Sequence, residues 1–233
     1  MVLPAIAFQW QEDRQQNRPE GQIYLEPQVW SVLSGVGREG RGRMAMDAAH
    51  ERLDTRRGLM IHTPPYTGLP NPEDPLPGNA PGAGENGSIF CHANTWAVIA
   101  ECLLGNGDRA FEYYGKLLPS VASDEEGQEH WGREPYVFTS SVIGPAQESR
   151  FGSAGISWLT GTASWAYIAA TQYILGIQPT FEGLRINPCL PSHWSKVCVS
   201  RRFRGRVHQI EMNDGTTFID GNSGGSTHQQ FHG

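Results

Sequence analysis

The stretch Glu85–Asp108, ENGSIFCHANTWAVIAECLLGNGD, decides how the rest of the chain is interpreted. Its apolar residues recur at three- and four-residue spacing, at Ile89, Ala93, Trp96, Ile99, Ala100 and Leu103. That spacing predicts a helix with one buried face. We expect the side-chain oxygen of Asn86 or Ser88 to cap the start of this helix, and Gly105 to supply the left-handed residue after its last turn.

His92 lies within about one turn of the expected helix start, where backbone N–H groups and the helix dipole favour an anion. Glu85 lies just ahead, on the loop that leads into the helix. A carboxylate and an imidazole at the mouth of a buried helix predict a site, although they do not by themselves indicate an enzyme. The alternatives are a hydrogen-bonded core histidine and a glutamate that only complements the helix dipole.

The composition is that of an ordinary soluble globular protein, with 233 residues, 38% of them hydrophobic and 18% charged. The net charge of -6 argues against sequence-independent binding of nucleic acid. The one locally basic run, residues 201–206, is expected to be a strand with solvated edges. No apolar run approaches the length of a membrane span, and no secretory signal is recognisable, so we expect a cytoplasmic protein.

The cysteines show neither a CxxC pair nor the Cys/His spacing of a zinc site; they are Cys91, Cys102, Cys189 and Cys198. We therefore expect free thiols and no metal. Seven tryptophans and seven tyrosines suit a sugar-binding cleft, because such rings stack on apolar sugar faces, but a protein core also uses them.

Upstream of the central stretch, residues 1–19 predict a weakly structured lead-in. The helix that follows has Pro27 near its start and a face formed by Val29, Val32, Leu33 and Val36. A second helix is expected over Gly40–Thr55, with its inward residues at Met44, Ala48 and Leu53. The proline-rich segment Gly58–Gly84 is expected to be a loop packed over the mouth of a pocket.

Downstream, Asp108 is expected to cap a further helix whose paired tyrosines pack between its neighbours. Residues 123–155 predict irregular structure, and Ile156–Ile177 a helix packed on nearly all sides. After Pro179 the chain shows short β-rich runs broken by proline and glycine. The tail beyond Asn213 is rich in glycine, serine and threonine and is expected to be disordered.

Several motifs together resemble glycoside hydrolase family 94, the inverting disaccharide phosphorylases. They are IYLEPQVW (23–30), GLMIHTPPYT (58–67), the central stretch with its extension to residue 114, REPYVFTSS (133–141), LTGTASW (159–165) and LGIQPTFEGLRINPCLPSHW (175–194). The resemblance covers roughly residues 20–206. It implies a mainly α fold, in which residues 20–178 form the late helices of an (α/α)6 barrel. Residues 179–212 would begin a β jelly roll. The tail, residues 213–233, shows no such match, and its expected disorder rests on composition alone.

The resemblance also implies a reaction. Inorganic phosphate attacks the anomeric carbon while an aspartic acid protonates the leaving oxygen, and direct attack inverts the configuration. His92, Thr160 and Gly161 match the phosphate-binding residues of the family, and Glu85 matches a residue that binds sugar hydroxyls. The catalytic aspartate is expected upstream of this chain, so no catalytic residue is assigned here. The implied partners are a disaccharide and inorganic phosphate as co-substrate, with no other cofactor, and a homodimer at full length.

Two other functions stay open. The chain could be a noncatalytic carbohydrate-binding or dimer-forming remnant of the same fold, or an α/α-barrel glycoside hydrolase that uses water. His92 with Thr160–Gly161 favours a phosphorylase, although Thr160 could simply bond a helix carbonyl. The missing acid predicts that this chain alone is inactive. Glu134 is expected to be a buried structural carboxylate, and Ser140 stands where relatives often carry glutamine, which leaves the specificity for the acceptor sugar open.

Overall fold

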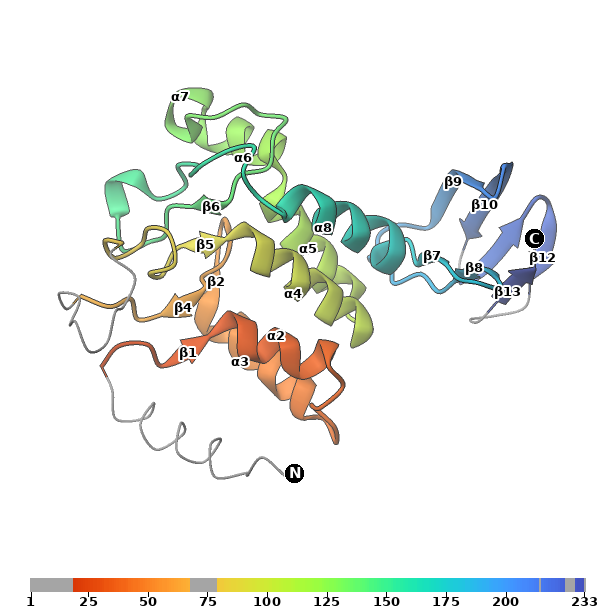
Figure 1. Ribbon diagram of the computed structural model, residues 1–233, viewed down its shortest axis with the longest axis horizontal. Coiled ribbons are helices and arrows are strands. Elements are labelled where there is room, and N and C mark those ends of the chain that lie inside the picture. The colour runs from red at the N-terminus through yellow and green to blue at the C-terminus, as the bar shows by residue number, and fades with distance from the viewer. Residues whose placement is uncertain (1–18, 68–78, 214, 225–228, 233) are drawn as a thin grey trace.

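The computed structural model describes residues 19–67, 79–213, 215–224 and 229–232 (Figure 1). A helical part comes first, and a smaller β unit lies at the far end of the molecule (Figure 1). Residues 1–18 of the expected lead-in lie outside the described residues. Within the described ranges, no helix is long and apolar enough to cross a membrane.

The helices form two layers. The inner layer consists of α2 (Leu25–Leu33), α4 (Cys91–Leu103) and α8 (Thr162–Ile168), with α4 in contact with both of the others. The outer helices α3 (Arg41–Leu53) and α5 (Gly107–Leu117) pack on α2 and α4, respectively. The three inner helices begin at the same end of the helical part (Figure 1). Their positive dipole ends therefore point to one side.

The central helix is buried on more sides than its sequence period predicts. Ala93, Ile99 and Ala100 are buried as expected, but Asn94 and Glu101 are also fully buried. Neighbours flank α4 on several sides, which removes the polar face that a surface helix would keep. In contrast, Leu103 in the last turn is 54% exposed, because it lies at the end of the helix, against the expectation.

The prediction that Asn86 or Ser88 caps the start of α4 is wrong. The N-cap of α4 is Phe90, and no side chain caps this end. Asn86 and Ser88 instead hydrogen-bond within the loop that precedes it, to backbone atoms of residues 66, 79 and 84. The expected left-handed residue after the helix is confirmed at Gly105, whose φ is 78°.

Two predictions about the outer helices are also wrong. Met44 is 70% exposed and Met46 is buried in its place, because packing against α2 turns another face of α3 to the core. Asp108 does not cap α5, since Asn106 is the N-cap residue. Asp108 lies in the first turn and accepts a hydrogen bond from the backbone N–H of Ser192, at 2.6 Å. The first helix, α2, ends at Leu33, so Val36 lies beyond its end and is exposed.

Helical structure extends into the segment that we expected to be irregular. α6 (Pro119–Glu126) and α7 (Gln128–Trp131) occupy the start of residues 123–155. Pro119 lies in the first turn of α6, where its missing N–H removes no helical hydrogen bond. A 3-10 turn, η1 (Glu148–Arg150), follows further along the segment.

The last inner helix is shorter than predicted. α8 begins at Thr162, and a π-helical turn, η2 (Ala169–Ile174), continues it. Residues 156–161 form a loop instead. α8 is not buried on all sides, because Tyr167 is exposed while Ala166 and Ala169 are buried.

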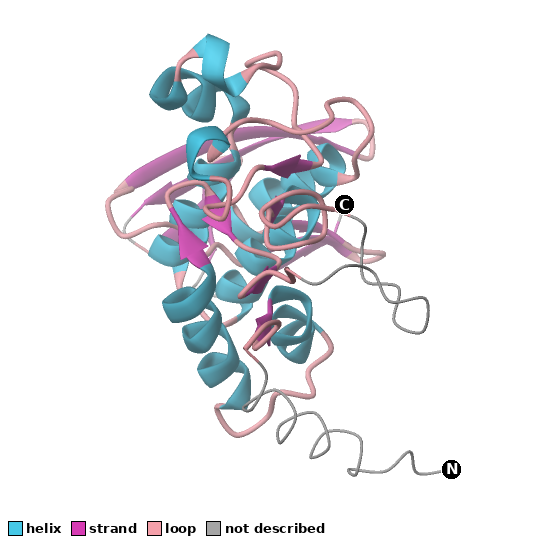
Figure 2. Cartoon of the chain, turned by 90° about the vertical axis from the view of Figure 1, so that its left-hand side faces the viewer, coloured by secondary structure: helices cyan, strands magenta, loops and turns pink. Residues whose placement is uncertain are grey.

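Short antiparallel strand pairs hold the loops near the starts of the inner helices (Figures 1 and 2). β1 (Ile23–Tyr24) pairs with β4 (His62–Thr63), and β5 (Ile89–Phe90) pairs with β6 (Ser141–Val142). β2 (Asp54–Thr55) pairs with β3 (Gly58–Leu59). Residues 58–67 of the proline-rich segment are thus ordered, and residues 68–78 lie outside the described residues.

The β unit contains two antiparallel sheets. One has the order β13 (Gln229–His232), β8 (Gly183–Ile186) and β7 (Ile177–Pro179). The other has the order β12 (Asn222–Gly224), β11 (Thr216–Ile219), β10 (Arg206–Asn213) and β9 (Lys196–Phe203). The two sheets share one hydrophobic core, which is formed by Ile177, Leu184, Ile186, Ile210, Met212 and Ile219.

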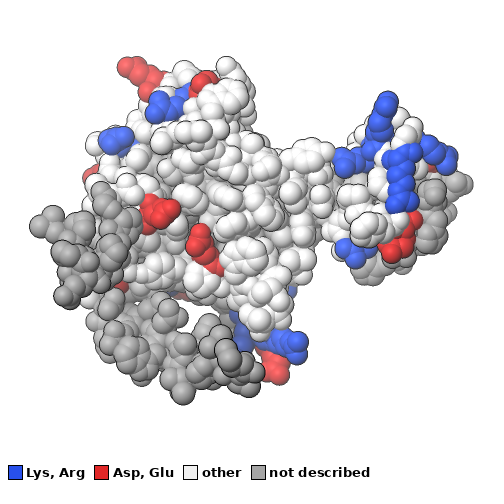
Figure 3. All heavy atoms as spheres, viewed as in Figure 1, with Lys and Arg blue, Asp and Glu red and all other residues white. Residues whose placement is uncertain are grey.

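The expected disorder of the tail is wrong for its described residues, 215–224 and 229–232. β11 pairs along β10, with Ile219 opposite Ile210, and the Ile219 side chain is only 5% exposed. Gly215 and Gly221 lie in turns next to the strands, and both have a positive φ. The basic run of residues 201–206 lies on β9, its turn and the start of β10, and Arg202, Arg204 and Arg206 are exposed. Basic side chains gather on this unit, while the helical face in the same view is largely uncharged (Figure 3).

Candidate functional site

His92 is the second residue of α4, at the end of the helical part where the inner helices begin. Its ring centroid lies 4.6 Å from that of Trp96 and 6.1 Å from that of Trp165. His92 Nε2 and Trp96 Nε1 are both buried and have no hydrogen-bond partner among the described residues. Burial lowers the pKa of His92, so the ring is neutral near pH 7. A neutral imidazole beside an indole offers two unused nitrogen atoms to a ligand.

Gly161 packs directly on the His92 ring. A Cβ atom at position 161 would lie 2.9 Å from His92 Cε1 and 3.2 Å from Nδ1. The φ of Gly161 is −76°, so space rather than backbone freedom requires the glycine. The structure therefore brings together two of the expected phosphate residues that are far apart in the sequence.

Thr160 precedes this contact. Its hydroxyl oxygen accepts a hydrogen bond from the Thr162 backbone N–H at 3.1 Å and lies 2.6 Å from Thr162 Oγ1. The Thr162 hydroxyl in turn donates to the Thr139 carbonyl oxygen at 3.2 Å. Thr160 thus bonds the first turn of α8 and not a helix carbonyl, and this arrangement fixes the loop at the His92 ring.

Glu85 lies on an ordered loop but is not joined to His92. Asn86 anchors the loop: its Oδ1 accepts from the Tyr66 backbone N–H at 2.8 Å, and its Nδ2 donates to the Tyr66 carbonyl at 2.9 Å. The Glu85 side chain is exposed, and among the described residues its carboxylate has no hydrogen bond or ion pair. An exposed carboxylate on a rigid loop is free to accept hydrogen bonds from a ligand.

Glu26 is a residue that the sequence reasoning missed. Burial and then the nearby charge of Glu85 raise its pKa. Two carboxylates are therefore close enough to interact at the start of α2 and the loop before α4. The signal available in the sequence was the acidic residue directly before Pro27 within IYLEPQVW. Asn94 was also missed: it is fully buried and bonds the backbone of Leu59 in β3.

Glu134 is half-buried rather than buried as we expected. Its Oε1 accepts a hydrogen bond from the indole N–H of Trp158 at 3.1 Å. Ser140 contributes backbone contacts: its carbonyl accepts from the Cys91 N–H at 3.0 Å, and its N–H donates to the Ile156 carbonyl at 2.8 Å. The loop with residues 156–161 is thereby tied to the start of α4.

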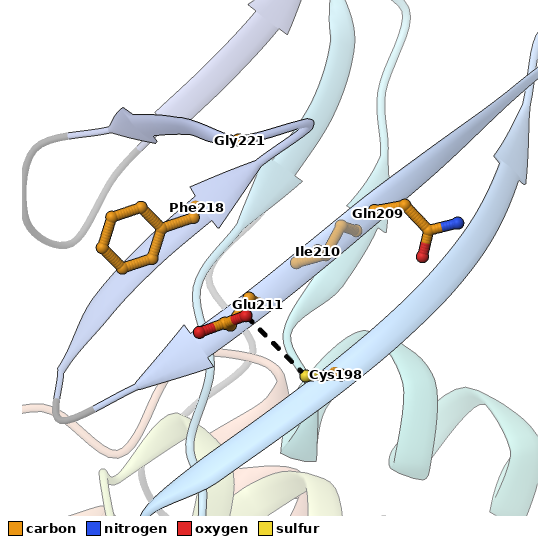
Figure 4. A pocket seen from close by; sticks show the side chains of 6 residues that line it. All are labelled: Cys198, Gln209, Ile210, Glu211, Phe218 and Gly221. Atoms are coloured by element: carbon orange, nitrogen blue, oxygen red, sulfur yellow. Dashed lines mark hydrogen bonds between the residues drawn. The ribbon is translucent and has the colours of Figure 1, made fainter.

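A separate hollow lies in the β unit (Figure 4). It has a volume of about 340 Å³ and is lined by Cys198, Gln209, Ile210, Glu211, Phe218 and Gly221. Its polar groups are already paired, Glu211 with Lys196 at 2.8 Å and Gln209 with Ser200 at 3.1 Å. In the described part of the chain, no three histidine, cysteine or acidic side chains are placed to hold a metal ion.

Comparison with known proteins agrees with the resemblance seen in the motifs. The profile of the Glycosyl hydrolase 94 superfamily, catalytic domain, matches residues 11–176. The chain belongs to the glycosyl hydrolase 94 superfamily. The profile of the Glycosyl hydrolase family 65, C-terminal domain, matches residues 180–233, which contain most of the β unit.

Three of the relatives of this glycosyl hydrolase 94 chain that are named as phosphorylases show the extent of the match. It is 38% identical to solabiose phosphorylase of Paenibacillus borealis over 84% of this chain and 25% of the relative. It is 40% identical to N,N'-diacetylchitobiose phosphorylase of Vibrio proteolyticus over 84% of this chain and 24% of the relative. It is 31% identical to 3-O-beta-D-glucopyranosyl-beta-D-glucuronide phosphorylase of Paenibacillus borealis over 83% and 25%, respectively. The chain thus spans about a quarter of the length of these relatives.

Proposed function

We propose that this chain is the C-terminal part of an inverting disaccharide phosphorylase. In this proposal, His92, Thr160 and Gly161 hold inorganic phosphate, and Glu85 binds hydroxyls of the sugar near the scissile bond. The α2, α4 and α8 layer with its outer helices is the late part of an (α/α)6 barrel, and the β unit begins a jelly roll. The whole protein is a homodimer.

The contact of Gly161 with the His92 ring carries the proposal. It places a backbone and an imidazole side by side where inner helices begin, and the imidazole Nε2 is buried without a protein partner. Buried polar atoms are nearly always paired, so an unpaired one calls for an explanation. We explain the unpaired Nε2 by a bound phosphate, because phosphate oxygens accept hydrogen bonds from imidazole, hydroxyl and backbone N–H donors.

In this proposal, phosphorolysis requires this part of the protein to supply hydrogen-bond donors for phosphate. Phosphate replaces the base and water of an inverting hydrolase, so donors are required where a hydrolase has a second carboxylate. The general acid is not assigned to any residue of this chain. We propose that another region of the whole protein supplies it, and that this chain alone is inactive.

The test joins residues 20–233 to the upstream part of the Vibrio proteolyticus relative and follows release of sugar 1-phosphate. We expect turnover that requires phosphate. His92→Ala should raise the KM for phosphate or lower kcat by at least about tenfold, since loss of one such hydrogen bond costs about 1.5–3 kcal/mol. The KM for the disaccharide should change much less.

Threonine variants provide a matched control. Thr160→Ala removes a hydroxyl at the proposed phosphate site, and Thr171→Ala removes one that only donates to the Tyr167 carbonyl, at 2.7 Å. Only the first should weaken the response to phosphate. Hydrolysis without phosphate would instead indicate a hydrolase, and weakened sugar binding with an unchanged phosphate response in His92→Ala would move His92 to the sugar site.

A further inference from the structure

Trp158 combines an exposed ring with a strained backbone. The residue is 69% exposed, and its φ of 69° lies in the left-handed region. A side chain this large rarely adopts that conformation, because Cβ then crowds the following carbonyl. Residues held in such conformations cluster at ligand sites, where the surrounding structure maintains them. Trp158 therefore invites a functional explanation.

The indole is held in place at its edge. Its N–H donates to Glu134 Oε1 at 3.1 Å. The backbone N–H of Glu134, and then the side chains of Trp158 and Ser157, lower the pKa of the Glu134 carboxyl. Glu134 therefore stays ionised and keeps its acceptor near neutral pH. Most of the ring surface remains open although its polar edge is fixed.

Trp158 also lies on the loop that carries the proposed phosphate residues. It precedes Thr160 by two positions and Gly161 by three. The loop is ordered by an isolated bridge between Thr139 and Ser157 and by a hydrogen bond from Arg133 Nε to the Gly155 carbonyl, at 2.7 Å. Trp158 thus lies on the same ordered loop as two of the proposed phosphate residues.

We propose that Trp158 is a stacking platform for a pyranose ring of the disaccharide, and that Glu134 is a positioning residue that fixes its indole. The choice of ligand rests on the proposed function. A pyranose presents an apolar C–H face that packs on an aromatic ring and hydroxyls that bond around it, whereas phosphate has no such face.

Trp158→Gly separates a sugar platform from a structural residue. Glycine tolerates the left-handed φ, so this variant should keep or raise the Tm while it weakens disaccharide binding by at least about tenfold. Glu39→Gly is the matched control, because Glu39 has a φ of 54° in the turn before α3. It should affect Tm in the same direction and leave sugar binding unchanged.

Two substitutions of Glu134 test whether its side-chain oxygen, which accepts the indole hydrogen bond, positions Trp158. Glu134→Gln keeps an oxygen that can accept the indole hydrogen bond and should bind sugar nearly as the wild type does. Glu134→Ala removes that oxygen and should weaken binding several-fold. Equal binding by these two variants would overturn the positioning role.

Binding is measured by calorimetry and tryptophan fluorescence with N,N'-diacetylchitobiose and cellobiose, in the absence of phosphate. Both this chain and the joined protein are used, so the result depends on neither turnover nor the phosphate site. Unchanged sugar binding in Trp158→Gly, or no saturable binding by either wild-type protein, would overturn the platform. Binding that depends on Trp158 in a protein that shows no phosphate-dependent turnover would instead overturn only the proposed function.

Discussion

Two of the residues with buried, unpaired polar atoms lie in the first turns of α4. His92 Nε2, Trp96 Nε1 and both ring nitrogens of His62 are buried and unpaired within the described residues. Each such atom loses its hydrogen bonds to water on folding, and the fold regains that free energy only if a ligand or water takes the place. We explain His92 by a ligand. His62 packs instead between the rings of Tyr24 and Tyr66, with centroid separations of 5.2 and 5.1 Å.

His62 should make the folded chain less stable in acid. Burial lowers its pKa below the ordinary 6.5, and the nearby carbonyls of Pro64 and Glu85 oppose this only in part. Below about pH 6.5 the unfolded state therefore binds more protons than the folded state, so the free energy of unfolding falls as the pH falls. His62→Phe should flatten this dependence between about pH 5 and 6.5 in denaturant titrations. An unchanged slope would contradict the prediction.

Gly161→Ala should damage the site more than the fold. The added Cβ would press on the His92 ring at 2.9 Å, so the ring must shift. We expect a loss of about 1–2 kcal/mol in the free energy of unfolding and a larger KM for phosphate in the joined protein. Gly115→Ala is the matched control: no atom lies within 4 Å of its added Cβ in α5, so it should be stabilising by up to about 1 kcal/mol. Equal phosphate responses in the two variants would contradict the role of the contact.

At the scale of elements, single side chains join segments that have few regular hydrogen bonds of their own. Asn94 of α4 accepts from the Leu59 N–H at 2.7 Å and donates to the carbonyls of Leu59 and Phe90 at 2.9 and 3.0 Å. Asn94 therefore takes the place of a second neighbouring strand, on the edge of β3 that β2 does not occupy. In the β unit the corresponding work is done by strand pairing, because β11 lies between β10 and β12.

Asn94→Ala should be strongly destabilising. It leaves the buried Leu59 N–H and carbonyl without their partner, at a cost of about 1–3 kcal/mol for each group left unsatisfied. Ser164→Ala, which removes an exposed hydroxyl bonded to the Gly161 carbonyl, should change the free energy of unfolding by less than about 0.5 kcal/mol. Chemical denaturation of both variants provides the comparison, and equal values would contradict the structural role of Asn94.

Ile219→Ala tests whether the tail is part of the β unit. Removal of this buried side chain should lower the free energy of unfolding of that unit by about 2–5 kcal/mol. Limited proteolysis should then cleave residues 206–219 faster than in the wild type. Thr216→Ala, at an exposed position of the same strand, should change the rate little. Rapid cleavage of the wild type after Asn213 would favour the disordered tail that we had expected from composition.

For the molecule as a whole, exposed apolar side chains are concentrated around the inner layer. Ile156, Leu159 and Tyr167 are exposed in α8 and the loop before it. Trp165 and Ile168 of the same stretch are half-buried and pack on the helical core. Large exposed apolar patches favour association with other surfaces.

We therefore predict that this chain by itself associates in solution. Sedimentation velocity should show concentration-dependent species, and Leu159→Glu should shift them towards the monomer, because a charge on the patch opposes association. Val36→Glu is the control, as Val36 is exposed beyond the end of α2. A sharp monomer at all concentrations, with cooperative thermal unfolding, would show a self-sufficient unit.

The sequence alone determined the features that depend on local pattern. The period of residues 89–103 predicted α4, Gly105 its left-handed end, and the change in composition near Pro179 the switch from helices to strands. The motifs identified the family. These predictions are confirmed because helix periodicity, glycine conformation and motif order are properties of short segments. The assignment of His92, Thr160 and Gly161 to a phosphate site comes from the same motifs and stays a prediction.

Tertiary structure decided what depends on distant neighbours. Met46 rather than Met44 faces the core because packing against α2 sets the rotation of α3. Residues 216–219 form a strand because β10 offers them hydrogen bonds, which the composition does not reveal. The His92–Gly161 contact joins residues 69 positions apart, and contacts with residues 134 and 139 hold the loop that carries Trp158. Such contacts form between elements after folding, so no local pattern encodes them.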